Sequence, residues 1–170
     1  MLFLTLSTFS STGGIQKVTR SIAHALSRLS QDQKEFGFKM LALKDDVADE
    51  RYIDHNNFTG FRNNRIAFAI RAVFLGINSN TILISHINLL PLAALMMVLR
   101  SSLKIVMLAH GVEVWRGIAN WKKRFINKHI NVWAVSDFTA QHLIDHQGID
   151  PDRIIIVNNC LDPFFEIPVS

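Results

Sequence analysis

The sequence has one cysteine and no long apolar run in its 170 residues. Cys160 alone cannot form an intramolecular disulfide, which excludes a disulfide-built domain and is typical of a reducing compartment. The longest apolar stretch, 87–99, is interrupted by Asn88 and Pro91 and is too short to cross about 30 Å of hydrocarbon. The first residues also lack the basic segment of a signal peptide. Together these absences predict a cytoplasmic protein.

Several site signatures are missing as well. Neither G-x-G-x-x-G nor G-x-x-x-x-G-K-[ST] occurs, which argues against a dinucleotide oxidoreductase and a P-loop ATPase. The lone cysteine has no sequence signature of a thiol enzyme around it. His142 and His146 lie four residues apart in a predicted helix, but no third ligand or H-E-x-x-H pattern accompanies them. A solvated helix face therefore explains the pair better than a metal site, and we expect no metal.

The charges are distributed unevenly along the chain, which has a formal net charge of +4. Residues 100–130 contain seven Lys or Arg and a single acid, Glu113, whereas residues 131–170 contain six acids and only Arg153 as a base. A basic middle beside an acidic end predicts a directional surface that prefers anionic partners.

Short apolar runs alternate with segments of helical period along the whole chain. The runs predict strands over 2–6, 36–43, 81–85, 103–109, 131–135 and 153–157. The periodic segments predict helices over 14–29, 66–75, 89–99, 119–129 and 136–148, the last with Ser136 as N-cap and Gly148 at its end. Residues 44–61 and 110–118 are expected to be loops. This order predicts an α/β fold, a Rossmann-like doubly wound parallel sheet with helices on both faces.

Polar residues follow the predicted strands, where ligands bind in such sheets. Gly13 and Gly14 join the first strand to its helix, and they serve either a tight turn or an anion such as phosphate at the open helix N-terminus. His86 follows the third strand and is a candidate substrate-binding residue. His110 and Glu113 follow the fourth strand, where His110 could exchange a hydrogen bond with a ligand hydroxyl or be a structural histidine.

The segment 118–130 combines apolar residues with four Lys or Arg. One interpretation is a helix at a membrane surface, with Trp121, Lys122, Lys123 and Arg124 facing anionic lipid. The other is an ordinary amphipathic helix that packs its apolar stripe on the sheet. No aromatic stacking motif supports nucleic-acid binding, and we expect no nucleic acid partner.

Three separated segments together resemble the N-terminal half of the GT-B glycosyltransferases, in particular the retaining enzymes of glycosyltransferase family 4. They are GGIQKVTRSIAHAL (13–26), LAHGVEVW (108–115) and VWAVSDFTAQHLIDHQGIDPDRIIIVNNCLDPFF (132–165). Two residues depart from the family pattern. Gln16 stands where the family often has Glu, and Cys160 replaces a glycine in the closing motif, where a positive φ would strain a cysteine.

The resemblance implies a role for each matching residue. Gly13 and Gly14 would lie close to the sugar-nucleotide diphosphate or the acceptor, and Lys17 would point at an anionic acceptor group. His110 would be catalytic, contacting the transferred sugar and the developing oxocarbenium ion, with Glu113 in the same loop. The family is also thought to need no protein nucleophile, because the leaving phosphate takes the acceptor's proton. It implies no metal or other cofactor beyond the nucleotide-sugar donor substrate.

The resemblance also divides the protein. Residues 1–162 would form the acceptor-side domain, and 163–170 would begin an interdomain linker. The family's second domain, which binds the nucleotide and carries a Glu-x7-Glu pair, is expected to be absent, because no two of the four glutamates (Glu35, Glu50, Glu113 and Glu166) have that spacing. We therefore expect this chain to be nearly inactive by itself.

The implied function is hexosyl transfer from a nucleotide-sugar to a glycan or lipid-linked acceptor, in the synthesis of a cell-surface polysaccharide or glycolipid. The enzyme would be cytoplasmic and peripheral at the inner membrane face, and residues 44–65 would set acceptor specificity. The alternative is a non-catalytic Rossmann-like module that binds a glycan or a phosphorylated ligand.

Overall fold

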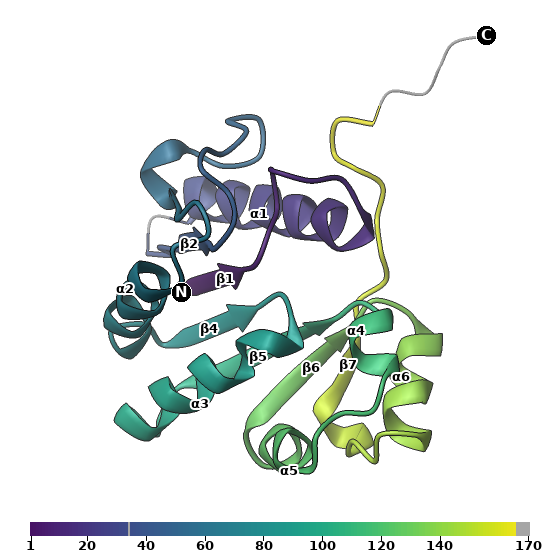
Figure 1. Ribbon diagram of the computed structural model, residues 1–170. Helices are drawn as coiled ribbons and strands as arrows, with labels where there is room; N and C mark the ends of the chain where they lie inside the picture. The colour runs from purple at the N-terminus through teal and green to yellow at the C-terminus, as the bar shows by residue number, and fades with distance from the viewer. Residues whose placement is uncertain (34, 166–170) are drawn as a thin grey trace, which may run out of the picture.

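Seven parallel strands form one sheet in the order β3-β2-β1-β4-β5-β6-β7 (Figure 1). The structure, a computed structural model, describes residues 1–33 and 35–165. The strands are β1 (Leu2–Thr5), β2 (Lys39–Ala42), β3 (Phe58–Gly60), β4 (Thr81–Ile84), β5 (Lys104–Ala109), β6 (Ile130–Ala134) and β7 (Ile154–Ile156). The helices are α1 (Gly14–Asp32), α2 (Arg65–Ile77), α3 (Leu90–Leu99), α4 (Val112–Trp115), α5 (Asn120–His129) and α6 (Asp137–Asp145).

Helices cover both faces of the sheet because its strands are apolar on both sides. Leu2 and Leu4 of β1 point into one buried cluster, which α2, α3, α5 and α6 cover. Phe3 points into a second cluster on the opposite face, which α1 covers. In Figure 1, α1 lies near the top of the molecule, α2 lies at the left, and α3 and α5 lie in the lower half. The predicted doubly wound parallel fold is confirmed.

The structure differs from the prediction mainly in two segments expected to be loops. Residues 44–61 contain β3, a three-residue edge strand that pairs only with β2. Residues 110–118 contain the one-turn helix α4. The strand predicted over 36–43 is shorter and is β2. Such short elements leave no recognisable period in a polar segment.

The two helix-terminal signals read from the sequence are confirmed. Ser136 Oγ accepts a hydrogen bond from the backbone N–H of Thr139 at 3.2 Å, and Gly148 has a φ of 68° just beyond α6. In the part of the chain that the structure describes, the non-glycine residues with positive φ are Arg62 and Asn63. Cys160 therefore carries none of the backbone strain that the family's glycine position suggested.

None of the helices in residues 1–33 and 35–165 combines the length and the apolar character needed to cross a bilayer.

Candidate active site at the carboxyl edge of the sheet

Four of the predicted site residues meet where the parallel strands end. Gly14 and His110 line one hollow of about 260 Å³, together with Glu113. His86 and Glu113 line a second hollow of about 460 Å³. Both hollows share Ile15 of α1 and Val112 of α4, so they are neighbours along one rim. The helix that the glycines open and the loop that carries His110 therefore form one continuous wall.

The N-terminus of α1 is open toward this wall. Gly13, its N-cap, is fully extended with φ 179° and makes no side-chain cap, and the first turn contains no acid. A side chain built at Gly14 would meet nothing within 4 Å. The glycine pair is thus required neither by a left-handed backbone nor by packing around Gly14. A Cβ at Gly13 would lie 2.6 Å from Oε1 of Gln16, so the side chain of Gln16 lies close to this end of the helix. The helix dipole favours an anion at the first-turn N–H groups.

His110 is held by one ring nitrogen and leaves the other without a partner. Its Nε2 lies 3.1 Å from the carbonyl oxygen of Ser85, so Nε2 carries the proton and donates it. Burial lowers the pKa of His110 below its ordinary value, and the opposing charge of Glu113 does not reverse this direction. The ring is therefore neutral. Among the described residues, Nδ1 is the one buried side-chain polar atom with no hydrogen-bond partner. It is an unsatisfied acceptor on a residue that lines the smaller hollow.

Glu113 fixes the loop that carries His110. Its Oε1 accepts hydrogen bonds from the backbone N–H of His110 at 2.5 Å and of Gly111 at 3.3 Å. Gly111 has a φ of 143°, a conformation that L side chains rarely adopt, and a Cβ there would lie 3.0 Å from the Trp115 ring. Here the glycine is required by the backbone, and the carboxylate holds the resulting turn.

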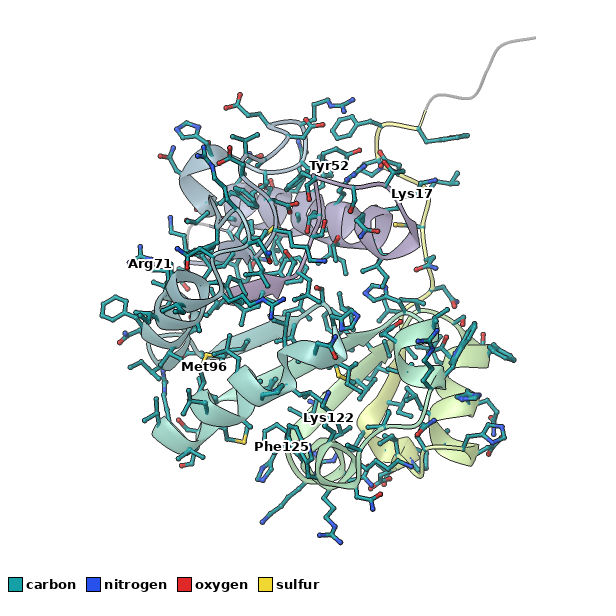
Figure 2. The ribbon with its side chains drawn as sticks, in the orientation of Figure 1. Lys17, Tyr52, Arg71, Met96, Lys122 and Phe125 are labelled. Atoms are coloured by element: carbon teal, nitrogen blue, oxygen red, sulfur yellow. The ribbon has the colours of Figure 1, made fainter. Side chains whose placement is uncertain are left out.

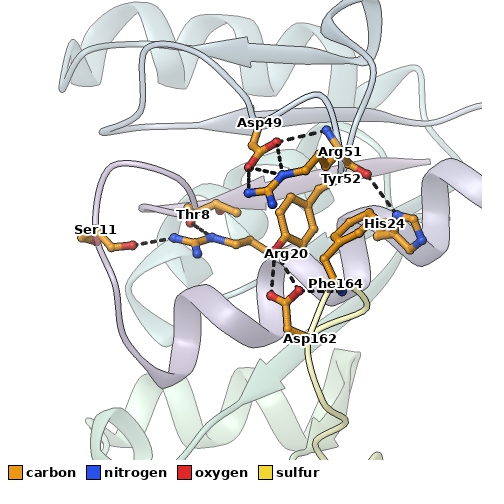
Figure 3. A network of polar contacts seen from close by, with 9 residues as sticks. All are labelled: Thr8, Ser11, Arg20, His24, Asp49, Arg51, Tyr52, Asp162 and Phe164. Atoms are coloured by element: carbon orange, nitrogen blue, oxygen red, sulfur yellow. Dashed lines mark hydrogen bonds and ion pairs between the residues drawn. The ribbon is translucent and has the colours of Figure 1, made fainter. Parts of the chain in front are cut away.

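The β1–α1 loop, which leads to the open helix end, is held by two residues that sequence reasoning missed. The buried Asp45 carboxylate accepts hydrogen bonds from the backbone N–H groups of Thr8, Phe9 and Ser10, at 2.7, 3.2 and 2.9 Å. Arg20 donates to the carbonyl oxygens of Thr8 and Ser11, both at 2.8 Å (Figure 3). The only sequence signal for Asp45 is an acid shortly after β2, inside the segment 44–61 that is predicted to be a loop.

His86 and Lys17 differ in how they relate to the site. His86 lines the larger hollow, and its Nδ1 accepts a hydrogen bond from Asn88 N–H at 3.0 Å, which caps the short 3-10 turn before α3. Burial lowers the pKa of His86 as well. Lys17 is exposed on α1 and lines neither hollow (Figure 2). Its role toward an acceptor stays a prediction.

The predicted membrane-facing segment contributes most of its apolar side chains to the core. Ile126 is fully buried, Ile118 is 7% exposed, and Phe125 packs against the same cluster. Trp121 is the exception at 47% exposed, and Lys122 Nζ lies 5.8 Å from the centroid of its ring. The apolar stripe of α5 therefore follows the amphipathic interpretation. Of the four residues predicted to face lipid, Trp121 and Arg124 are exposed, whereas Lys122 and Lys123 are half-buried.

The last described residues contact α1 and the segment around Tyr52 (Figure 3). Tyr52 Oη donates to the Asp162 carboxylate, at 2.7 and 2.9 Å from its two oxygens. The Phe164 ring packs edge-on against Tyr52 and His24, with centroid distances of 5.1 and 5.2 Å. The boundary predicted after 162 falls inside this attached segment, and residues 166–170 lie outside the described residues.

The sheet order and the hollows at its carboxyl edge are those of a Rossmann-like domain with a ligand site at its strand ends. A family model, Glycosyltransferase Family 4, matches residues 12–164. The chain belongs to this family. No match was found among curated proteins.

Solved structures agree on the fold. A glycosyltransferase from Rickettsia africae matches 92% of this chain with a TM-score of 0.61 and 16% identity. Anabaena HepE in complex with UDP-glucose matches 94% with a TM-score of 0.65 and 14% identity, and HepE with UDP matches 93% with 0.64 and 15%. The chain spans 42 to 44% of the length of these proteins.

Proposed function

We propose that this chain is the acceptor-side half of a retaining glycosyltransferase that takes a hexosyl group from a nucleotide-sugar donor. The observation that carries the proposal is the buried, unpartnered Nδ1 of His110 beside the open N-terminus of α1. Nδ1 of His110 offers an acceptor for a sugar hydroxyl, and the N-terminus of α1 offers N–H groups for an anion. A sugar linked to a diphosphate contains both groups, and HepE, a protein of this fold, was solved with UDP-glucose.

In the proposed reaction, the bond between the anomeric carbon and the phosphate oxygen breaks and a bond from the acceptor oxygen forms on the same face. The departing phosphate takes the proton of the acceptor hydroxyl. Residues of this chain bind and orient the reactants. His110 holds the sugar through Nδ1, and the first turn of α1 stabilises negative charge. Glu113 acts as a positioning residue because its carboxylate holds the backbone of the His110 loop.

The acceptor, the compartment and the missing half belong to the proposal too. We infer a glycan or lipid-linked acceptor in cell-surface polysaccharide or glycolipid synthesis, and a cytoplasmic enzyme that associates peripherally with the inner membrane face. The nucleotide would be held by a second domain, and the 170-residue chain alone should turn over little substrate. Residues 44–65, which contain β3 and Asp45, are the proposed source of acceptor specificity.

Saturation-transfer NMR with UDP-glucose tests the His110 contact on the chain itself. We expect signal transfer to the glucosyl protons in the wild type and its loss in His110→Ala, because the variant removes the acceptor that faces the sugar. His129→Ala is the matched control, since His129 is exposed on α5, away from the hollow. Equal glucosyl signals in wild type and His110→Ala would remove the assignment.

A further inference from the structure

The larger hollow at the carboxyl edge, of about 460 Å³, has no part in the reaction proposed above. It is lined by Ile15 of α1, by His86, Ile87 and Asn88 before α3, and by Val112, Glu113 and Arg116 in and after α4. Because it shares Ile15, Val112 and Glu113 with the smaller hollow, whatever binds in it lies next to the group that contacts His110. Its chemistry therefore bears on the second reactant.

His86 offers this hollow a hydrogen-bond donor. Its Nδ1 accepts the backbone N–H of Asn88 at 3.0 Å, so the neutral ring carries its proton on Nε2. The ring is neutral because burial lowers the pKa of His86. The charge of Glu113 opposes this shift, while the charges of Lys122 and Lys44 add to it. In the part of the chain that the structure describes, the bond through Nδ1 is the one that the ring makes, which leaves the Nε2 donor for a ligand.

Three cations lie around the hollow. Arg116 lines it and is exposed. Lys122 extends from α5 (Figure 2), and its Nζ donates to the carbonyl oxygen of the lining residue Ile87 at 3.4 Å. Lys44, from the segment proposed to set acceptor specificity, is close enough for its charge to act on His86. Within residues 1–33 and 35–165, none of the ion pairs includes one of these three cations.

Glu113 is the acid that lines the hollow, and it is already engaged by the loop that it holds. Its Oε1 accepts hydrogen bonds from the backbone N–H groups of His110 and Gly111. Three cations against one such carboxylate leave an excess of positive charge. The donors are of three kinds, a ring N–H, a guanidinium and an ammonium, and charge-assisted hydrogen bonds from such groups select oxyanions.

We propose that the larger hollow binds an anionic group of the acceptor, a phosphate or a carboxylate, with the Arg116 guanidinium as its main contact and the Nε2 donor of His86 beside it. The inference rests on the proposed function, and it narrows the acceptor to molecules that carry an anion near the reacting hydroxyl. It also assigns the anion contact expected of Lys17 to other residues, because Lys17 lines neither hollow.

The donor's diphosphate is the other source of an anion at this edge of the sheet. In the proposed reaction it lies at the first turn of α1, whose Gly14 lines the smaller hollow together with His110. The two anions would then occupy neighbouring hollows, and a variant of the larger one should affect the acceptor's anion alone.

Titration of the 170-residue chain with inorganic phosphate and with acetate, followed by amide NMR shifts, tests the inference. Chloride keeps the ionic strength constant, because salt screens exposed charges. We expect the wild type to shift at Asn88 and Val112, and Arg116→Gln to raise the Kd for phosphate about tenfold through the loss of a charge-assisted bond. Arg116→Lys should recover part of the affinity, because it restores the charge without the guanidinium fork. The matched control is Arg71→Gln, which removes an exposed charge on α2 beside a different hollow.

Saturation-transfer NMR with UDP-glucose separates the two sources of the anion. Arg116→Gln should give the wild-type glucosyl signal, because the donor occupies the smaller hollow. A weaker glucosyl signal in Arg116→Gln would assign the larger hollow to the donor's diphosphate and overturn the inference. Unchanged phosphate affinity in Arg116→Gln, or an equal loss in Arg71→Gln, would overturn it as well. A glucosyl signal that depends on His110, without phosphate or acetate binding by the wild type, would retain the proposed function and remove the anion site.

Discussion

Replacing Asp45 by Asn isolates the interactions that hold the β1–α1 loop. Both Asp45 and Thr8 are fully buried, so an unmade bond there is not replaced by water. Oδ2 accepts from Thr8 and Phe9, and Oδ1 accepts from Ser10. An amide can keep its oxygen toward Thr8 and Phe9 only by turning its NH₂ group toward the N–H of Ser10. One charge-assisted bond is then lost and two are weakened.

We expect this change to lower the free energy of unfolding by about 2–4 kcal/mol, since hydrogen bonds to charged groups contribute about 1.5–3 kcal/mol each. A domain of ordinary stability, about 5–15 kcal/mol, remains folded after such a loss. Urea unfolding followed by tryptophan fluorescence measures the effect as a midpoint lowered by roughly 1–2 M, with the slope unchanged.

Asp46→Asn is the matched control for this experiment. Asp46 lies next in the chain, but its side chain is half exposed and its Oδ1 is bonded to Arg62 Nε at 2.6 Å. Exposed ion pairs contribute at most about 1 kcal/mol. If Asp45→Asn and Asp46→Asn shift the midpoint equally, the carboxylate does not organise the loop and the reasoning is wrong.

Three further predictions concern other parts of the chain. Because burial lowers the pKa of His110, the unfolded chain binds the proton more readily, so its contribution to stability is complete above about pH 6.5 and declines below it by at most about 1.4 kcal/mol per pH unit. The urea midpoint should therefore fall less in His110→Gln than in the wild type when the pH is lowered from above to below about 6.5. Tyr52→Phe removes the hydroxyl that binds Asp162, and amide exchange over residues 161–165 should accelerate about tenfold while the sheet is unaffected; unchanged exchange would contradict the attachment. Gly111→Ala should cost about 1–3 kcal/mol in thermal unfolding, because its φ of 143° is unsuited to alanine. Gly117→Ala, with open space around it, should cost less.

The sequence predicted those features of the fold that depend on neighbouring residues. The alternation of apolar runs and helical periods was sufficient for the parallel sheet, and Ser136 and Gly148 marked one helix correctly. Asp45 could not be found in this way, because its partners Thr8 to Ser10 lie 35 to 37 positions earlier in the chain. Their proximity follows only from the pairing of β1 with β2.

The sequence also could not show which side of a helix faces the core. Segment 118–130 allowed two interpretations, a membrane surface and an amphipathic helix packed on the sheet, and the burial of Ile126 in the core agrees with the second. In α2, apolar residues surround the helix, and the sequence gives no way to tell which side faces outward. The candidate residues Gly14, His86, His110 and Glu113 were predicted from the strand ends and line neighbouring hollows, but the tautomer of His110 required the position of Ser85.

The way in which the β1–α1 loop is held has a consequence for redesign. Asp45 and Arg20 contact only main-chain atoms of residues 8–11. These main-chain contacts do not depend on the side chains of the loop, but the hydroxyls of Ser10 and Ser11 also bond to Ser7 Oγ at 3.0 and 2.9 Å. Thr12 follows this bonded segment, which makes position 12 the practical starting point for a library that changes what the cleft accepts.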